Sequence, residues 1–462
     1  MPTPELAAVL ACPRCELALQ QFPDDSFHCG SCSLHFPELD GVPCLFAEPA
    51  ATLAEWRQRL HFAREKLLQD AAGLKAELQN PRLRPLTRER LALLHEASVD
   101  QAHRLAQLLR PLALHQSEAG IATHLALQTR LPADQGLTTY YANIHRDWAW
   151  GDEENAQSLE LVSRALLGSQ QDDTPAPGTA VVLGSGAGRL AYDLHQLLPL
   201  EVTIALDFNP LLALLAARTV SGEGTELWEF PIAPRSIGDH AVLQTLVAPS
   251  PVRDGFHLIL ADVLRPPLRP ESVDLVVTPW VVDILPENFQ AFAARVNRLL
   301  KPGGRWVNFG SLAFSQPAAA ARYSLEETLA IVMDSGFAEP AAWEDEIPYM
   351  CSPASRHGRR ELVVTIAATK EQSVPGPARH RALPDWLVGG TQPVPLLPDF
   401  ELQTMTTRIY AFIMGLIDGR RSVLDMARLI ADQRLMTREE AEPAVRTFLT
   451  KMYEDSQRPK HF

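Results

Sequence analysis

The sequence predicts an α/β fold built around a mostly parallel β-sheet. Apolar runs of strand length alternate with helix-like segments over residues 179–370. The first run, Val181–Leu183, is followed by glycine at every second position and then by a helix start, and a second run, Val202–Leu206, ends at an aspartate. Strands that alternate with helices are joined by crossover connections, and these make neighbouring strands parallel.

Size and charge limit the classes of protein that need to be considered. The chain has 462 residues, 46% of them apolar, 21% charged, and a net charge of −14, values typical of a globular protein with more than one domain. The acidic balance makes nucleic acid an unlikely partner. No apolar run reaches the ~18–20 residues that span a bilayer, and the first residues do not resemble a signal peptide. We therefore expect a cytoplasmic protein without membrane association.

Residues 1–48 are expected to form a zinc ribbon. Cys12 and Cys15 form one C-x-x-C pair, and Cys29 and Cys32 form a second. Each pair supplies two thiolates from one turn, and four thiolates give the closed tetrahedron that structural zinc prefers. Two redox pairs are the poorer interpretation, because no strand–helix–strand pattern surrounds either one. The sequence therefore predicts a structural Zn²⁺ site with no open position for catalysis.

The next region, residues 49–178, is expected to form a helical cap on the sheet. Leu, Ala, Arg, Glu and Gln dominate residues 52–130, and apolar residues recur there at three- and four-residue steps. The stretch Thr139–Trp148 is aromatic and then charged. Its aromatic side chains are either ordinary core or a cover for a bound ligand. A polar loop, residues 169–178, leads to the first strand.

The turn after the first strand carries Gly184, Gly186 and Gly188. Glycine allows the backbone to approach a ligand closely, and the helix that begins at Arg189 offers free N–H donors. The G-x-G-x-G spacing is shorter than the loop that a pyrophosphate needs. It favours a cofactor without phosphate, such as S-adenosylmethionine (SAM). Asp207, at the end of the second strand, is placed to accept hydrogen bonds from a ribose diol.

Two further residues are candidate cofactor ligands. Asp262 follows the apolar run 258–261 and is expected to face the adenine amino group, with an Asx turn as the alternative. Arg189 at the helix start is expected to meet the methionine carboxylate, with a solvated arginine as the alternative. The remaining elements of the sheet region are strands at 273–277, 305–309 and 361–367 and helices at 289–300 and 324–335.

Taken together, residues 179–370 resemble a class I SAM-dependent methyltransferase domain, which implies a Rossmann-like sheet of seven strands. A narrower resemblance is carried by Ile144–Trp148, which is similar to the I-x-R-D-W segment of carnosine N-methyltransferase and its relatives. The glycine turn and Lys301–Gly310, with its Trp306 and Asn308, continue the match. This resemblance spans about residues 50–370.

The narrower family implies a clamp for an imidazole acceptor. By motif, its aspartate is Asp283 and one of its tyrosines is Tyr349. Its histidine is replaced by Ser315, and its second tyrosine falls near Gly358 or Arg359. The resemblance therefore implies the reaction type but not the acceptor. Asp283 is interpreted as the carboxylate that orients an imidazole or an amine, with a helix N-cap as the alternative. Tyr349 either shapes the acceptor pocket or is plain packing.

Two flanking regions resemble known modules. The segment Leu10–Phe46 is similar to Trm112-like zinc ribbons, which accompany methyltransferases as separate partners or fused domains. Prolines mark residues 371–399 as a linker. Residues 400–462 contain two capping-box patterns and an Asp418-Gly419 turn. They resemble PqqD-like peptide-binding winged domains. This implies a helical or winged domain with a peptide or protein partner, and a structural appendage is the alternative.

The leading hypothesis is a SAM-dependent N-methyltransferase that acts on a small imidazole- or amine-containing metabolite or a peptide, such as a carnosine- or histidine-like acceptor. The first alternative is an RNA base methyltransferase, because zinc ribbons also precede some of these enzymes. The second alternative is a non-catalytic SAM-binding scaffold. The intact glycine turn and Asp207 favour retained cofactor binding.

Overall fold

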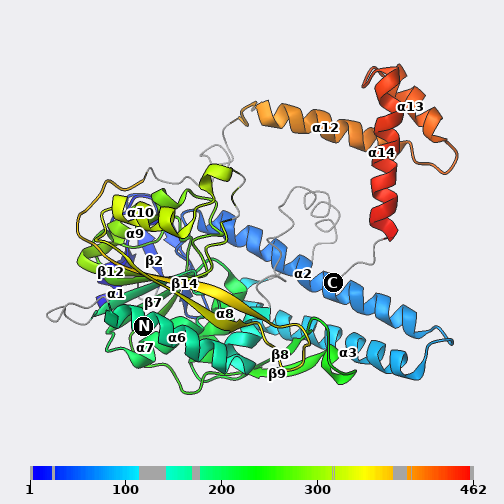
Figure 1. Ribbon diagram of the computed structural model, residues 1–462. Helices are drawn as coiled ribbons and strands as arrows, with labels where there is room; N and C mark the ends of the chain where they lie inside the picture. The colour runs from blue at the N-terminus through cyan, green and yellow to red at the C-terminus, as the bar shows by residue number, and fades with distance from the viewer. Residues whose placement is uncertain are drawn as a thin grey trace. The chain divides into compact units, whose positions relative to one another are not determined.

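The computed structural model describes residues 4–22, 26–113, 142–168, 177–314, 316, 318–377, 393–396 and 398–457. The chain forms two compact units, Met1–Ala382 and Leu383–Phe462 (Figure 1). The border between the units falls inside the predicted linker 371–399. Parts of the predicted helical cap (114–141) and of the loop before the first strand (169–176) lie outside the described residues.

The first unit is built on a seven-stranded sheet in the order β10-β7-β6-β11-β12-β14-β13. Only β14 runs against the others, because it pairs antiparallel with both of its neighbours. From β6 the chain first adds strands on one side, β7 and β10, and then on the other side, beginning with β11. The direction in which strands are added thus reverses at β6, the strand before the glycine turn. In sheets of this kind a ligand binds at the carboxyl ends of the strands at such a point, so the ends of β6 and β11 are the expected ligand site. The strands are β6 Thr179–Leu183, β7 Val202–Asp207, β10 Phe256–Leu260, β11 Val273–Pro279, β12 Leu300–Gly310, β13 Ala341–Tyr349 and β14 Arg359–Thr369.

Alternate residues of the central strands enter two different cores, as the period of two in a strand requires. Val182 packs in one core with residues of α6 and α7, whereas Val181 packs in the other with residues of α9. Helices therefore cover both faces of the sheet. The helices of this region are α6 Asp152–Gly168, α7 Arg189–Leu197, α8 Pro210–Val220, α9 Phe289–Leu299 and α10 Leu325–Asp334, with short 3₁₀ turns η3 Gly238–His240 and η4 Ala319–Ala321.

The cysteine-rich segment packs directly on the edge of this sheet. Cys44 forms a parallel bridge with Leu260 of β10, and the N–H of Leu45 donates to the Leu260 carbonyl at 2.8 Å. Phe27 and Phe36 are fully buried in a core that also contains strand β6 residues. The segment thus continues the sheet and shares its core. Its elements are α1 Pro4–Val9, β1 Gln20–Gln21, β2 Phe27–Cys29, β3 Leu34–Phe36, β4 Glu38–Leu39 and β5 Val42–Pro43.

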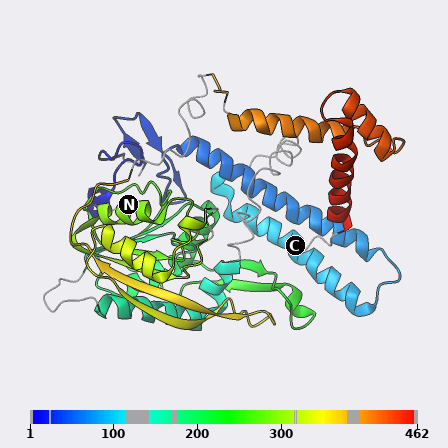
Figure 2. The ribbon, with the colours of Figure 1, turned by 45° about the horizontal axis from the view of Figure 1, so that its top comes forward.

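Two long helices, α2 Pro49–Leu78 and α3 Pro85–Leu108, lie side by side as an antiparallel pair (Figure 2). The short η1 Arg110–Leu112 follows α3. A hairpin inserted before β10, β8 Thr225–Glu229 and β9 Val242–Leu246, packs on α3. Its Trp228 donates from Nε1 to Asp100 of α3 at 2.7 Å. No helix of the described residues is long and apolar enough to cross a membrane.

The second unit contains α12 Pro398–Gly415, α13 Val423–Asp432 and α14 Arg438–Gln457. Both predicted capping boxes are present, at Ser422 with Asp425 and at Thr437 with Glu440. The helices enclose a small core around Ile413, Met426 and Ile430. The described part of this unit, 393–396 and 398–457, contains no strand, so it shows the helical but not the winged element of the expectation.

Candidate functional site

The glycine turn occupies the sharp connection between β6 and α7. Gly184, Gly186 and Gly188 have φ angles of +74°, +57° and +86°. A Cβ on Gly184 would come within 2.9 Å of the Val281 side chain, whereas a Cβ on Gly186 would meet nothing within 4 Å. The turn therefore needs glycine for its backbone conformation and keeps an open side at Gly186, where a ligand can approach the main chain.

Asp207 ends β7 and lies directly against this turn. Its Oδ2 accepts from the N–H of Gly186 at 2.8 Å, and its Oδ1 accepts from the N–H of Asn209 at 2.9 Å. Burial raises the pKa of Asp207 to about 6, an effect that the hydrogen bonds from the backbone partly oppose. The structure thus brings the predicted glycines and the predicted ribose acceptor together at one edge of the sheet.

The other two candidate cofactor residues are engaged by protein groups. Asp262 is partly exposed, and its Oδ1 accepts from the N–H of Leu264 at 2.9 Å, which is the Asx turn of the alternative interpretation. Arg189 donates to Asp193 at 2.8 Å and to the Asp147 carbonyl at 2.7 Å. The guanidinium of Arg189 is thus neither solvated nor free toward the glycine turn, and its role as a carboxylate ligand stays a prediction.

The segment after residue 141 forms the wall beside the glycine turn. It includes η2, a π-helical turn at Arg146–Trp150. The indole N–H of Trp148 donates to the Ala187 carbonyl at 2.9 Å, inside the glycine turn. Trp148 also stacks with Arg189, whose guanidinium lies 5.4 Å from the ring. Of the predicted aromatic stretch, this tryptophan packs against the turn, whereas residues 139–141 lie outside the described residues.

Arg146 and Glu154 form a nearly buried ion pair that the sequence interpretation did not single out. The Arg146 guanidinium donates to Glu154 at 2.8 Å and to Asp147 at 2.7 Å. The second Glu154 oxygen accepts from the N–H of Met350 at 2.8 Å. Burial raises the pKa of Glu154 above its ordinary value. The pair joins η2 to the residue that follows β13. In the sequence it is visible as an arginine eight positions before a glutamate in the first turn of α6.

Trp280, directly after β11, and Tyr349, at the end of β13, pack together. Their ring centroids lie 4.9 Å apart, and the Arg359 guanidinium lies 4.7 Å from the Tyr349 ring. Trp280 follows β11 with a φ of +51°, a costly conformation for a side chain of this size. A Cβ on Gly310 would lie 3.0 Å from the Trp280 Cα, so glycine is needed where β12 ends.

Asp283 lies in the loop that follows Trp280 and is 3% exposed. Its Oδ2 accepts from the Ser311 hydroxyl at 2.6 Å and from the N–H of Ala313 at 3.0 Å. Asp283 is therefore not a helix N-cap, which was the alternative interpretation, because Asn288 caps α9. Ser315, which stands in place of the family's histidine, lies outside the described residues.

Asn308, part of the family motif, lies inside the sheet rather than at the crevice. It pairs across the strands with Thr278, whose hydroxyl donates to Asn308 Oδ1 at 2.9 Å. The same hydroxyl accepts from Trp306 Nε1 at 2.9 Å. All three side chains are buried. The pair Trp306 and Asn308 therefore marks a polar network that holds β11 to β12.

A comparison with family models identifies the central region: residues 181–307 match the model described as "Methyltransferase domain". Residues 181–307 are thus similar in sequence to methyltransferase domains. The match begins at the strand before the glycine turn and ends in β12. It includes the glycine turn and Asp207, from which the sequence predicts SAM as the cofactor. No curated protein matches the chain.

Solved structures with similar folds include three methyltransferase-related proteins. Haemonchus contortus phosphoethanolamine N-methyltransferase 2 has 14% identity and a TM-score of 0.33, with 53% of this chain and 59% of that chain covered. A complex containing the Haloferax volcanii Trm112 methyltransferase activator has 15% identity, 50% and 96% coverage and a TM-score of 0.33. The N-methyltransferase NodS from Bradyrhizobium japonicum has 14% identity, 47% and 97% coverage and a TM-score of 0.31. The chain spans less than two thirds of the Haemonchus enzyme.

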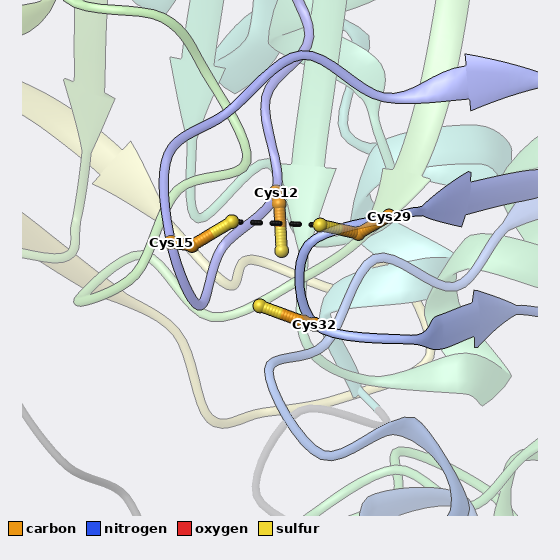
Figure 3. Close-up of side chains that lie close together, drawn as sticks. All are labelled: Cys12, Cys15, Cys29 and Cys32. Atoms are coloured by element: carbon orange, nitrogen blue, oxygen red, sulfur yellow. Dashed lines mark hydrogen bonds between the residues drawn. The ribbon is translucent and has the colours of Figure 1, made fainter.

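The four cysteines beside the methyltransferase domain converge on one point (Figure 3). The sulfur atoms of Cys12, Cys15, Cys29 and Cys32 all lie within 4.8 Å of one another, which is compatible with one tetrahedral zinc ion. Burial raises the pKa of the Cys12 thiol above its ordinary value. A bound divalent cation would keep this sulfur ionised at neutral pH. The donor set therefore fits Zn²⁺ in a structural role.

Proposed function

We propose that the protein is a SAM-dependent N-methyltransferase whose acceptor is a small imidazole- or amine-containing metabolite or peptide. The proposal rests mainly on Asp283. This carboxylate is buried, it faces the loop that follows β12, and both of its hydrogen bonds with described residues reach the same oxygen, Oδ2. With respect to the described residues, the other oxygen is left to accept an N–H from an acceptor. The family resemblance at Ile144–Trp148 and Lys301–Gly310 supports the same assignment.

Asp283 would position the acceptor nitrogen. A carboxylate that accepts one imidazole N–H fixes the tautomer and raises the basicity of the opposite nitrogen. SAM, when bound, supplies an electrophilic methyl group on a sulfonium. The glycine turn and Asp207 would hold the adenosine part of the cofactor, and Asp262 would face the adenine.

Trp280 and Tyr349 would form the apolar wall of the acceptor site. Their rings, whose centroids lie 4.9 Å apart, would exclude water from the space beside Asp283, and desolvation of this kind would strengthen each hydrogen bond made there. Burial raises the pKa of Tyr349, so its hydroxyl stays protonated at neutral pH and can donate to an acceptor. Because the histidine of the family clamp is missing, we propose that the acceptor is held chiefly by Asp283 and this wall.

The flanking segments are assigned by resemblance. We propose that residues 1–48 form a Trm112-like zinc ribbon that is fused to its methyltransferase, 49–178 a helical cap, and 179–370 the catalytic domain. Residues 371–399 would form the linker. Residues 400–462, similar to PqqD-like domains, would bind a peptide or protein partner.

The proposal is tested by incubating the full chain with methyl-labelled SAM and a panel of small acceptors. The panel contains histidine, β-alanyl-histidine, histamine and simple primary amines, and product formation is followed by transfer of label. Transfer to an imidazole or amine nitrogen is expected. Label in added RNA alone would identify the RNA alternative, and SAM binding without transfer to any substrate would identify a scaffold.

A further inference from the structure

Tyr349 and Arg359 face each other where β13 ends and β14 begins. The two residues are directly opposite in the antiparallel register, and the Arg359 guanidinium lies over the Tyr349 ring, 4.7 Å from its centroid. Both β12 and β13 pair antiparallel with β14, so β13 runs in the same direction as β12 and, with it, as β11 and β6. Arg359 therefore lies at the carboxyl edge of these strands, the edge that also carries the glycine turn and the loop of Asp283.

An aromatic pair connects Arg359 to the loop that holds Asp283. The Tyr349 ring lies against Trp280, with 4.9 Å between the ring centroids, and Trp280 precedes Asp283 by three residues. The side chains of Arg359, Tyr349 and Trp280 thus contact one another in sequence. Arg359 is the charged end of the aromatic wall that the proposed function assigns to the acceptor.

Only one nitrogen of the Arg359 guanidinium is paired with a described residue. Its Nε lies 2.7 Å from Glu361 Oε2, whereas Nη1 and Nη2 have no hydrogen-bond partner among the described residues, and the side chain is 58% exposed. A guanidinium presents its N–H donors in a fixed fork that matches two oxygens of a carboxylate or phosphate. The Nη edge of Arg359 can therefore still bind an anion.

The neighbouring segment adds positive charge. Residues 351–360 contain three arginines, one histidine and no aspartate or glutamate, in a chain whose net charge is −14. Arg356 donates to the carbonyls of Pro234 and Arg235, and Arg235 donates to the Ser355 carbonyl. Carbonyl groups are neutral, and neither arginine forms an ion pair with a described residue, so both charges are uncompensated there. The potential at this end of β13 and β14 therefore favours anions.

We infer that Arg359 binds an anionic group of the methyl acceptor, a carboxylate or a phosphate, while Asp283 accepts the acceptor's N–H. This inference rests on the proposed methyltransferase function and specifies its acceptor as an imidazole or amine that also carries an anion. Arg359 binds a part of the acceptor that does not react, so its contribution is the same in the ground state and the transition state. Its loss therefore raises KM and leaves kcat nearly unchanged.

The inference is tested with methyl-labelled SAM and four imidazole compounds that differ at one position. Histidine carries a carboxylate there and histidinol phosphate a phosphate, whereas histamine and histidinol carry no anion. The wild type is expected to have a kcat/KM at least ~10-fold higher for an anionic compound than for the neutral ones, equivalent to ~1.4 kcal/mol. A preference for only one anionic compound identifies which anion the site binds. Equal kcat/KM for all four compounds overturns the inference.

Variants of the ion pair separate anion binding from a purely structural role. Arg359→Ala should abolish the preference for the anionic compounds through KM, and Arg359→Lys should restore part of it. Glu361→Gln should increase the preference, because it removes the carboxylate that competes for the guanidinium. If Arg359 served only to pair with Glu361, both Arg359→Ala and Glu361→Gln would lower kcat/KM for all four compounds alike. That result overturns the inference.

The matched control is Arg360→Ala. It removes the same charge from the next residue of β14, and the two arginine side chains are equally exposed, at 58%. Arg360 pairs with Glu346 and, as the next residue of a strand, points to the opposite face of β14. The control should leave the ratio of anionic to neutral kcat/KM unchanged. A loss equal to that of Arg359→Ala would assign the preference to overall charge and overturn the inference.

A second readout does not depend on methyl transfer. The exposed Cys351 thiol donates to the carbonyls of Tyr349 and Arg359. Its labelling is timed with the anionic sulfonatoethyl and the cationic trimethylammonioethyl methanethiosulfonate, each relative to its rate with 2-mercaptoethanol, and labelled Cys351 is identified by peptide mass. The anionic reagent is expected to react faster, and Arg359→Ala to reduce this ratio more than Arg360→Ala does.

Equal relative rates for the two reagents in the wild type, or equal changes in the two variants, overturn the anion site. The labelling result also separates this inference from the proposed function. If no compound is methylated but the labelling ratio depends on Arg359, the acceptor of the proposed function is wrong and the anion site at Arg359 stands.

Discussion

The carboxylate of Asp283 accepts the hydroxyl hydrogen of Ser311 at 2.6 Å, across the gap between the loops that follow β11 and β12. Both loops begin at the carboxyl edge of the sheet, on neighbouring strands. The contact fixes one oxygen of the carboxylate and thereby the direction of the other. A carboxylate fixed in this way can orient an acceptor without first paying for its own ordering.

Replacing Asp283 with Asn should lower kcat by about 10²–10⁴-fold, because an amide cannot raise the basicity of the acceptor nitrogen as a carboxylate does. SAM affinity should change little, since the Asp283 carboxylate is bonded to Ser311 and Ala313 and not to the glycine turn or Asp207. Turnover and calorimetric binding are measured together. Asp334→Asn, an exposed change at the end of α10, is the control. Unchanged turnover in the Asp283 variant would remove this residue from the reaction.

The raised pKa of Asp207 leads us to expect that cofactor binding depends on pH. Burial raises its pKa to about 6, and a ribose hydroxyl that donates to it favours the ionised form. SAM affinity should therefore fall as the pH drops below about 6, approaching tenfold per pH unit. Titration calorimetry from pH 5 to pH 8 measures the effect. Asp207→Asn should bind more weakly at pH 8 and lose the dependence, and a variant that kept it would place the titrating group elsewhere.

The same group affects stability in a defined window. Between its ordinary value of 3.8 and about 6, the folded protein binds more protons at Asp207 than the unfolded chain does. Its contribution to the free energy of unfolding therefore declines as the pH rises through that window. The stability of Asp207→Asn relative to the wild type should rise across this range, as measured by urea unfolding at each pH. A flat difference would contradict the raised pKa.

The sequence predicted those parts of the fold whose signals are local. The run Val181–Leu183 is buried on both faces of the sheet, and continuous apolar sequence is the signature of such a strand. The glycine turn and the cysteine pairs are recognised from the short, fixed spacing of their residues in the sequence. By contrast, β13 was missed because Trp343–Glu346 is largely charged, as is usual for an edge strand. The β8–β9 hairpin was also missed.

Contacts between distant segments could not be predicted from the sequence. Nothing in the sequence near Asp283 specifies Ser311 as its partner, because the pairing depends on the register between β11 and β12. Arg189 was expected either to be solvated or to bind the cofactor. Its guanidinium instead donates to the carbonyl of Asp147, which lies 42 positions earlier in the chain. Such pairings arise from tertiary packing. The sequence placed distant residues together only where a known type of site relates them, as it did for the two cysteine pairs and for the glycine turn with Asp207.

Substitution of Arg189 distinguishes a role of this side chain in stability from a role in binding the cofactor carboxylate. Arg189→Ala should lower the free energy of unfolding by about 1.5–3 kcal/mol, because it removes charged hydrogen bonds to Asp193 and to the Asp147 carbonyl. SAM affinity should change far less than in Asp207→Asn. Denaturant unfolding and calorimetry are compared with Arg428→Ala, in which a largely exposed arginine is lost. A large loss of SAM affinity with unchanged stability would instead support the carboxylate contact.

Removing the metal from the cysteine cluster should destabilise the methyltransferase unit and not only the ribbon. Cys44 and Leu45 pair with Leu260 at the end of β10, two residues before Asp262, and Phe27 and Phe36 lie in the core of the sheet. Chelation of the metal, or the Cys29→Ser substitution, removes metal–sulfur coordination that would link the two cysteine pairs of this segment. We expect the melting temperature of the unit to fall by several degrees at least and SAM affinity to fall with it.

The matched control is Cys351→Ser, which changes an exposed thiol outside the cluster and should leave both quantities unchanged. Scanning calorimetry, zinc analysis and SAM titration are made on the same samples, and added Zn²⁺ should restore the chelated protein but not Cys29→Ser. If only the ribbon melted while the SAM affinity of the remainder was unaffected, the shared core around Phe27 would not couple the two parts. A coupled loss would show that the contacts between the cysteine-rich segment and the sheet, which include the Cys44–Leu260 bridge and the core around Phe27, transmit the metal's contribution to the cofactor edge.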